Sequence, residues 1–157
     1  MSNEILSLLK ESGAFLEGHF LLTSGRHSDK YIEKFRLMES PNHLDKVCQK
    51  MSSQFSKDSV DIVLGAAIGG ILLSSGVAKY LGKKGIFTER VQEKMELRRG
   101  FEIQEGSNVL IVEDIVSTGG SIFELIECCK DSSLCKTSFG FPVEPVVLNL
   151  FIHNSLY

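Results

Sequence analysis

The chain has 157 residues and a formal net charge of −3, and 43% of its residues are hydrophobic and 24% charged. This length and composition predict one globular domain and exclude a disordered protein. The lack of a basic excess argues against nucleic-acid binding, and no apolar run is long enough to span a membrane. The first nine residues lack the pattern of a signal peptide, so we expect a cytoplasmic protein.

The cysteines and histidines show no metal-binding pattern. Cys48, Cys128, Cys129 and Cys135 have no C-x-x-C spacing, and the four histidines have no H-x-x-x-H or H-E-x-x-H spacing. We therefore expect reduced thiols, as is usual in the cytosol, and histidines that lie at the surface or in packing positions.

The first forty residues predict a helix followed by two short extended runs. Residues 3–11 carry apolar side chains at helical spacing, and Gly13 follows as a cap. The extended runs cover residues 15–22 and 30–37, with a polar turn over residues 23–28. This turn is either an ordinary hairpin turn or a substrate contact through Ser24, Arg26 or Ser28, and turn chemistry slightly favours the first interpretation.

The rest of the chain alternates helices and strands. Ser40-Pro41 is a typical helix start, and the helix over residues 41–55 should bury Leu44, Val47, Cys48, Met51 and Phe55. A strand at 60–64 precedes a helix at 69–81, which should turn Ile71, Leu72, Ala78 and Leu81 inward and end at Gly82. Strands at 85–88 and 109–112 and a helix at 118–130 follow.

This alternation predicts a parallel sheet with helices on its faces. Ligands of such sheets bind beyond the carboxyl ends of the strands. Two strand-to-helix turns, residues 65–70 and 113–121, should therefore line the same site.

Residues 109–121 carry most of the functional information. Four apolar residues precede two carboxylates, Glu113 and Asp114, and a loop of hydroxyl and glycine residues then opens a helix. Backbone N–H groups at a helix start bind phosphate, whereas adjacent carboxylates repel it and accept hydrogen bonds from sugar hydroxyls. The pattern lacks the P-loop lysine and the G-x-G-x-x-G of dinucleotide sites, so it predicts a site for a phosphorylated sugar.

Two other segments have both a structural and a functional interpretation. The glycine-rich turn at 65–70 is either a close helix–sheet contact or a cradle for a second phosphate group. The charged segment 89–107 is either a solvated hairpin or a lid. Its length and its place between two core strands favour a lid, in which Arg90 and Lys94 neutralise a leaving diphosphate.

These motifs resemble those of a known family. Residues 109–121 are similar, over all thirteen positions, to the phosphoribosyl-pyrophosphate (PRPP) motif of type I phosphoribosyltransferases. Residues 18–31, 65–71 and 86–101 resemble the substrate-side signature, the pyrophosphate loop and the catalytic loop of bacterial orotate phosphoribosyltransferases, in the family's order. The resemblance covers about residues 5–130.

The resemblance implies a fold and a reaction. The fold is a helix-flanked parallel sheet within a single domain, with a small amino-terminal hood (1–40), a PRPP-binding core (41–131), a flexible loop (88–107) and a shortened tail (132–157). The reaction transfers 5-phosphoribosyl from PRPP to N1 of orotate, giving orotidine 5′-monophosphate and pyrophosphate in UMP biosynthesis. It requires Mg²⁺, which is held mainly through PRPP, and it implies a homodimer.

The resemblance also implies residue roles. Glu113 and Asp114 would bind the ribose hydroxyls, and Lys94, Arg90 and Asp114 are the implied catalytic residues. Further PRPP-binding residues are Ile115, Val116, Ser117, Thr118, Gly119, Gly120, Ser121, Gly69 and Gly70. Lys94 and Arg90 would close on the pyrophosphate, often that of the neighbouring subunit. Orotate would contact Ser117, Tyr31 and Arg26.

The chain departs from the family after the PRPP helix. Members normally have a further core strand ending in Asp-Arg, whose Arg holds orotate, but this chain has no Arg after Arg99. A piece near residues 131–137 and one core strand are therefore expected to be missing, which should weaken orotate binding and expose the edge of the 109–112 strand. Two alternatives stay open: a type I transferase for another base, and a PRPP-binding homologue with little catalysis.

Overall fold

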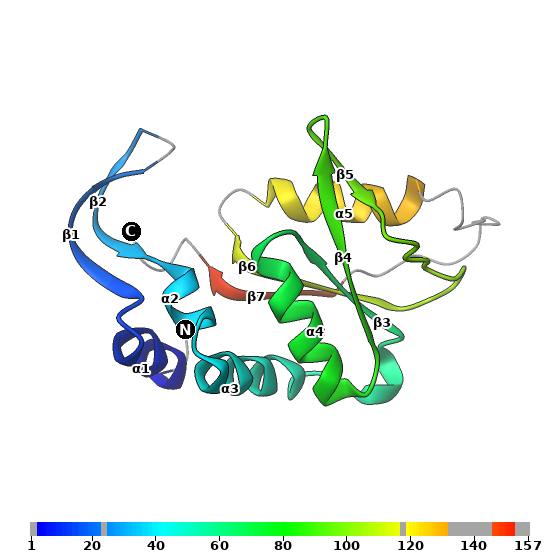
Figure 1. The fold of residues 1–157 in the computed structure, drawn as a ribbon, viewed down its shortest axis with the longest axis horizontal. Helices are drawn as coiled ribbons and strands as arrows, with labels where there is room; N and C mark the ends of the chain where they lie inside the picture. Colours follow the sequence, from blue (N-terminus) through cyan, green and yellow to red (C-terminus); the bar gives the residue numbers. More distant parts are fainter. Residues whose placement is uncertain (1–2, 23–24, 117–118, 132–145, 153–157) are drawn as a thin grey trace.

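The computed structural model describes residues 3–22, 25–116, 119–131 and 146–152. Its core is a five-stranded sheet in the order β5-β4-β3-β6-β7 (Figure 1). The strands are β3 (Ile62–Ala66), β4 (Lys84–Val91), β5 (Lys94–Leu97), β6 (Val109–Val116) and β7 (Val146–Ile152). All neighbouring strands are parallel except β5, which is antiparallel to β4. The prediction of an α/β fold with a largely parallel sheet is confirmed.

Helices cover both faces of this sheet. Side chains that alternate along a strand point to opposite faces, and Val63 and Leu110 pack with α3 (Pro41–Ser52) and α4 (Gly69–Leu81). Ile62 and Ile111 pack instead with α5 (Gly120–Asp131) on the other face. No helix in the described ranges is long and apolar enough to cross a membrane.

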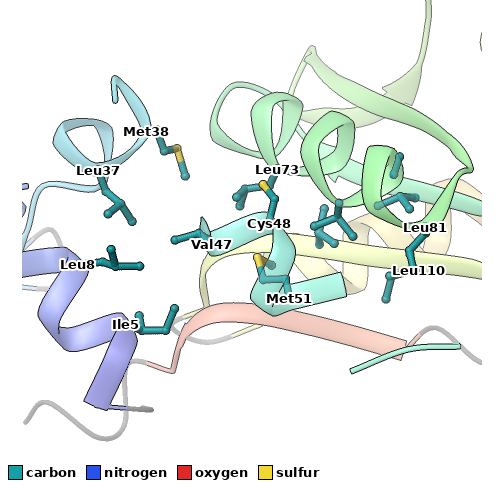
Figure 2. Packing of buried hydrophobic residues seen from close by; sticks show 14 of the residues in the cluster. Ile5, Leu8, Leu37, Met38, Val47, Cys48, Met51, Leu73, Leu81 and Leu110 are labelled. Atoms are coloured by element: carbon teal, nitrogen blue, oxygen red, sulfur yellow. The ribbon is translucent and has the colours of Figure 1, made fainter. Parts of the chain in front are cut away.

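The amino-terminal lobe, residues 3–40, joins the core through the first of these packed layers. It contains α1 (Asn3–Glu11), a two-stranded antiparallel sheet of β1 (Phe15–Leu21) and β2 (His27–Ile32), and α2 (Lys34–Met38). Figure 2 shows Ile5 and Leu8 of α1 and Leu37 and Met38 of α2 in one cluster with residues of α3 and α4. The lobe is therefore held to the core by apolar packing.

The expected extended run over residues 30–37 is wrong in its second half. Strand β2 ends at Ile32, and α2 begins at Lys34. A short run with scattered apolar residues fits both periods. The helix is favoured here because it buries Leu37 and Met38, which are 1% and 4% exposed, against the rest of the apolar cluster.

Helix α4 begins and ends where the sequence predicts, but part of its inward face was wrongly assigned. Gly82 caps it in the left-handed conformation, with φ of +69°. Ala78 and Leu81 are buried as predicted, whereas Leu72 is 41% exposed and Ile71 is half-buried. The other buried positions of the helix are Gly69, Gly70, Leu73, Ser74 and Val77. In α3, Val47, Cys48 and Met51 are buried as predicted, with Leu44 packed at the margin. The helix ends at Ser52 and not at residue 55 as predicted, so Phe55 packs against the cluster from beyond it, before a short 3₁₀ helix, η1 (Lys57–Ser59).

The charged segment after residue 88 begins as a β-hairpin. Strand β4 runs on to Val91, and a two-residue turn leads into β5. Both turn residues, Gln92 and Glu93, have positive φ (46° and 68°), as the hairpin turn that matches strand twist requires. The sequence lacks the Asn-Gly signal of such turns, so only the structure shows where the hairpin turns.

Strand β6 is not an edge strand, which corrects the expectation of an exposed edge beside residues 109–112. Strand β7 pairs with it in parallel, from Leu110 opposite Val146 to Val116 opposite Ile152. The expected missing piece near residues 131–137 lies, except for Asp131, outside the described residues.

Candidate functional site

The two adjacent carboxylates lie near the carboxyl end of β6, deep in the molecule. Glu113 is 6% and Asp114 is 2% exposed. Strand β6 extends to Val116, so the predicted strand 109–112 is four residues too short and the acidic pair lies inside it. Acidic side chains are almost never fully buried unless they are paired. Each carboxylate should therefore have a hydrogen-bond or ion-pair partner in the protein or gain one from a ligand.

Asp114 is held by three segments of the chain. Its Oδ1 accepts a hydrogen bond from the Ile115 backbone N–H at 2.7 Å, and its Oδ2 lies 2.6 Å from the Lys34 ammonium of α2. A Cβ on Gly69 would lie only 1.8 Å from Oδ2, so the carboxylate occupies the space of a side chain at that position. The predicted meeting of the 65–70 turn with the acidic pair is thereby confirmed.

Glu113 has an unpaired oxygen. Its Oε1 accepts a hydrogen bond from the Asp114 N–H at 3.3 Å, but its buried Oε2 has no partner within the described structure. Burial, followed by the charge of Asp114, raises the pKa of Glu113 to about 7, and the Ser121 hydroxyl opposes this slightly. A buried acceptor without a donor is costly, so this oxygen is suited to a hydroxyl supplied by a ligand.

The glycine-rich turn between β3 and α4 is packed against itself. A Cβ on Gly65 would lie 2.2 Å from the Gly70 carbonyl oxygen, and one on Gly70 would lie 3.0 Å from Gly65. The structural interpretation of these two glycines is therefore correct. It is compatible with a phosphate cradle, because α4 begins at Gly69 and its first backbone N–H groups have no partners within the helix.

The second helix start lies beside the first. Strands β3 and β6 are neighbours, and α5 begins at Gly120, after Gly119 with φ of +81°. Ser121 lies close enough to influence the pKa of Glu113. Ser117 and Thr118, predicted to bind phosphate, lie outside the described residues, whereas Ile115 and Val116 end β6 and are half-buried.

The structure does not bring the predicted catalytic cations to the acidic pair. Arg90 Nη2 lies 2.5 Å from Glu124 Oε2 of α5, and its Nη1 donates to the Glu93 carbonyl at 2.6 Å. Lys94 is exposed at the start of β5. Within the described ranges neither side chain has a hydrogen bond or ion pair to Glu113 or Asp114. Whether this hairpin closes over a ligand stays a prediction.

Two of the three residues predicted to face orotate, Tyr31 and Arg26, lie on the amino-terminal lobe, and the third, Ser117, lies outside the described residues. Tyr31 of β2 is 40% exposed and stacks on Phe20, with ring centroids 5.4 Å apart. Arg26 is exposed before β2, where its carbonyl accepts a hydrogen bond from the Leu22 N–H at 2.8 Å. No contact described for the structured ranges joins either side chain to the acidic pair.

Sequence reasoning missed Lys34. It lies 80 residues before Asp114, within a segment expected to be extended, and no motif marks it. The only signal in the sequence is that a buried acidic pair needs a cation. Spacing along the chain does not show which lysine or arginine that cation is.

Comparison with known proteins agrees with this geometry. A family model described as the phosphoribosyl transferase domain matches residues 37–137. The orotate phosphoribosyltransferase of Thermoanaerobacter sp. (strain X514) is 46% identical, over 92% of this chain and 83% of that protein.

Solved structures show the same fold. The orotate phosphoribosyltransferase of Aeropyrum pernix superposes with a TM-score of 0.73 at 21% identity, over 97% of this chain and 95% of that one. The adenine phosphoribosyltransferase of Saccharomyces cerevisiae gives 0.66 at 18% identity, over 96% and 91%. The fold is thus shared by enzymes named for different bases. The likeness to orotate enzymes in particular rests on sequence identity. The chain belongs to the phosphoribosyltransferase family and, within it, to the orotate phosphoribosyltransferases.

Proposed function

We propose that this protein transfers the 5-phosphoribosyl group of PRPP to N1 of orotate, releasing pyrophosphate and forming orotidine 5′-monophosphate for UMP biosynthesis. The observation that carries the proposal is the buried carboxylate pair, with one unpaired Glu113 oxygen, between the starts of α4 and α5. The sequence identity of the chain to orotate phosphoribosyltransferases supports orotate as the base.

PRPP uses three parts of this site. The ribose 2- and 3-hydroxyls donate to Glu113 and Asp114, which satisfies the unpaired Glu113 oxygen. The diphosphate lies at the 65–70 turn and the 5′-phosphate at the 117–121 loop, because each precedes the positive end of a helix.

Bond breaking at the anomeric carbon leaves positive charge on the ribose and negative charge on the departing diphosphate. Lys94 and Arg90 neutralise that negative charge when the β4–β5 hairpin closes, and Arg90 then exchanges Glu124 for the diphosphate. The hairpin also keeps water from the ribosyl cation.

A magnesium ion fits the donor chemistry of this site. Carboxylate oxygens and diphosphate oxygens are the hard ligands that Mg²⁺ prefers, and the ion needs few protein ligands when phosphates supply the rest. Within the described ranges no group of three or more His, Cys, Asp or Glu side chains is placed to hold a metal ion. When bound, Mg²⁺ would add to the neutralisation of the leaving diphosphate.

Orotate is placed against the amino-terminal lobe. In this proposal Tyr31 flanks the base, Ser117 is a further contact carried over from the family resemblance, and the exposed Arg26 is the candidate partner for the orotate carboxylate. We further propose that the protein is a cytoplasmic homodimer. In this dimer the β4–β5 hairpin of one subunit closes over the diphosphate bound to the other.

The test is a direct assay of orotidine 5′-monophosphate from PRPP, Mg²⁺ and orotate, with uracil, adenine and hypoxanthine in parallel. We expect product from orotate alone, at a low rate, because no Arg follows Arg99 to pair with the orotate carboxylate. Turnover with another base would contradict the proposed substrate. PRPP binding without any turnover would instead indicate a PRPP-binding homologue.

If turnover and orotate affinity are both ordinary, another Arg must hold the carboxylate. Arg26→Gln would then raise the KM for orotate while leaving PRPP affinity unchanged. Orotate affinity that does not respond to this substitution would exclude Arg26.

A further inference from the structure

Lys34 is the cation that lies beside the acidic pair in the folded protein. Its Nζ lies 2.6 Å from Asp114 Oδ2, with the Lys34 side chain 28% exposed and that of Asp114 only 3% exposed. The same ammonium lies 5.4 Å from the centroid of the Phe35 ring. The contact joins α2 of the amino-terminal lobe to β6 of the core, so the two parts of the site meet here.

The position of Lys34 points toward the diphosphate cradle. Its Nζ would lie 3.5 Å from a Cβ on Gly69, the residue that starts α4. The ammonium and the first backbone N–H groups of α4 are thus positive groups at one place. A partly exposed lysine on a flexible stem can move to a new anionic partner there.

Both oxygens of Asp114 are occupied in this state. Oδ1 accepts from the Ile115 N–H, and Oδ2 is paired with Lys34. A sugar hydroxyl that takes Oδ2 therefore competes with the ammonium. A diphosphate arriving at Gly69 at the same time offers that ammonium a partner of higher charge.

We propose that Lys34 is a diphosphate-binding residue that changes partner during PRPP binding. It pairs with Asp114 in the free protein and moves to the diphosphate when the ribose hydroxyls bind Asp114. This inference rests on the proposed function, since it requires PRPP at the site. The alternative is that Lys34 only neutralises the buried Asp114 and keeps that place when ligand binds.

Two ligands separate these possibilities. PRPP and ribose 5-phosphate share the ribose hydroxyls and the 5′-phosphate, but only PRPP has the diphosphate. Titration calorimetry with each ligand and Mg²⁺ should be run on the wild type, Lys34→Met and Lys79→Met. Lys79 is the matched control, because its ion pair with Asp45 lies at the surface between α3 and α4.

We expect Lys34→Met to weaken PRPP binding about ten- to a hundredfold, as loss of one charge-assisted hydrogen bond predicts. Binding of ribose 5-phosphate should stay the same or strengthen, and Lys79→Met should match the wild type. Equal weakening of both ligands would overturn the proposal and leave Lys34 a structural partner of Asp114. Stronger binding of both would show that Lys34 only blocks the carboxylate, which also overturns it.

Further variants keep the test decisive if Lys34→Met does not fold. Lys34→Arg retains the charge and should retain most of the preference for PRPP over ribose 5-phosphate. Asp114→Asn combined with Lys34→Met removes both charges, and it should lose that preference relative to Asp114→Asn alone. A wild type that binds no PRPP contradicts the proposed function, whereas normal PRPP binding by a folded Lys34→Met contradicts only this inference.

Discussion

The acidic pair and the β4–β5 hairpin are both rich in charge, but they hold their charges differently. Glu113 and Asp114 are 6% and 2% exposed, and Asp114 is packed against Gly69 and Lys34. Glu89 of the hairpin forms a bidentate pair with Arg99, which follows β5, at N–O distances of 3.0 and 2.8 Å, yet the Arg99 side chain is 63% exposed. Buried charges interact strongly but pay for desolvation, whereas exposed pairs are screened by water.

The contrast divides the expected roles of the two regions. The acidic pair is already arranged before ligand arrives, so its substitution should affect binding and stability. Of the hairpin cations, Arg90 is paired with Glu124 at the surface and Lys94 is exposed to solvent. Their substitution should therefore affect the ligand-free protein little. They should matter when negative charge develops on the leaving group.

The largest effect should come from Lys94→Ala. We expect kcat to fall by roughly a hundred- to a thousandfold, the scale of removing one group that stabilises transition-state charge, with little change in the KM for PRPP. Steady-state assays with saturating orotate measure both constants. A raised KM with normal kcat would make Lys94 a ground-state contact and would break the contrast.

Asp114→Asn should have the next largest effect. Loss of a charge-assisted hydrogen bond, at about 1.5–3 kcal/mol, predicts PRPP binding weaker by about ten- to a hundredfold in a protein that still folds. Calorimetric titration measures the affinity, and circular dichroism checks the fold. If the folded variant binds PRPP normally, Asp114 does not hold the ribose.

Glu113→Gln should remove a pH dependence of PRPP binding. The ionised carboxylate is the better acceptor for ribose hydroxyls, so wild-type affinity should rise as the pH passes through about 7. The PRPP phosphates titrate equally with both proteins, so the difference between their pH profiles isolates Glu113. Parallel profiles would exclude Glu113 as the titrating group.

The same substitution should change stability in a pH-dependent way. The folded pKa of about 7 lies above the ordinary 4.5, so the unfolded chain ionises first and the wild type loses stability as pH rises from about 4.5 through 7. Above that range Glu113→Gln should be the more stable protein by about 1–2 kcal/mol, after allowance for solvent screening. At pH 4 the two should melt alike; a constant difference in Tm across pH would argue against this cause.

The smallest effect should come from Arg99→Gln. This substitution breaks the bidentate pair with Glu89, but the guanidinium is largely exposed, so we expect Tm to change by no more than about 1 °C. Arg98→Gln is the control at the neighbouring position. A clear fall in Tm for Arg99→Gln alone would show that the hairpin depends on this pair and would weaken the contrast with the buried site.

Local pattern predicted much of the fold. The long apolar and glycine-bounded segments were assigned correctly in type, including α1, α3, α4, α5 and the central strands, because their periodicity and caps agree. The errors fell where local signals were weak. Helix α2 lies where the pattern predicts a strand, the buried face of the first turns of α4 differs from the predicted one, and β6 extends four residues beyond the predicted strand.

The order of residues along the chain was enough to predict the acidic pair, the two glycine-bearing turns and their meeting at one edge of the sheet, because strand–turn–helix order fixes where the carboxyl ends of parallel strands lie. The partners of these residues within the site became visible only in the folded chain. Lys34 reaches Asp114 because apolar packing of Leu37 and Met38 places α2 beside the core, and Gly69 abuts the same carboxylate across the sheet. Such pairings depend on how distant segments pack, so the spacing of residues along the chain does not predict them.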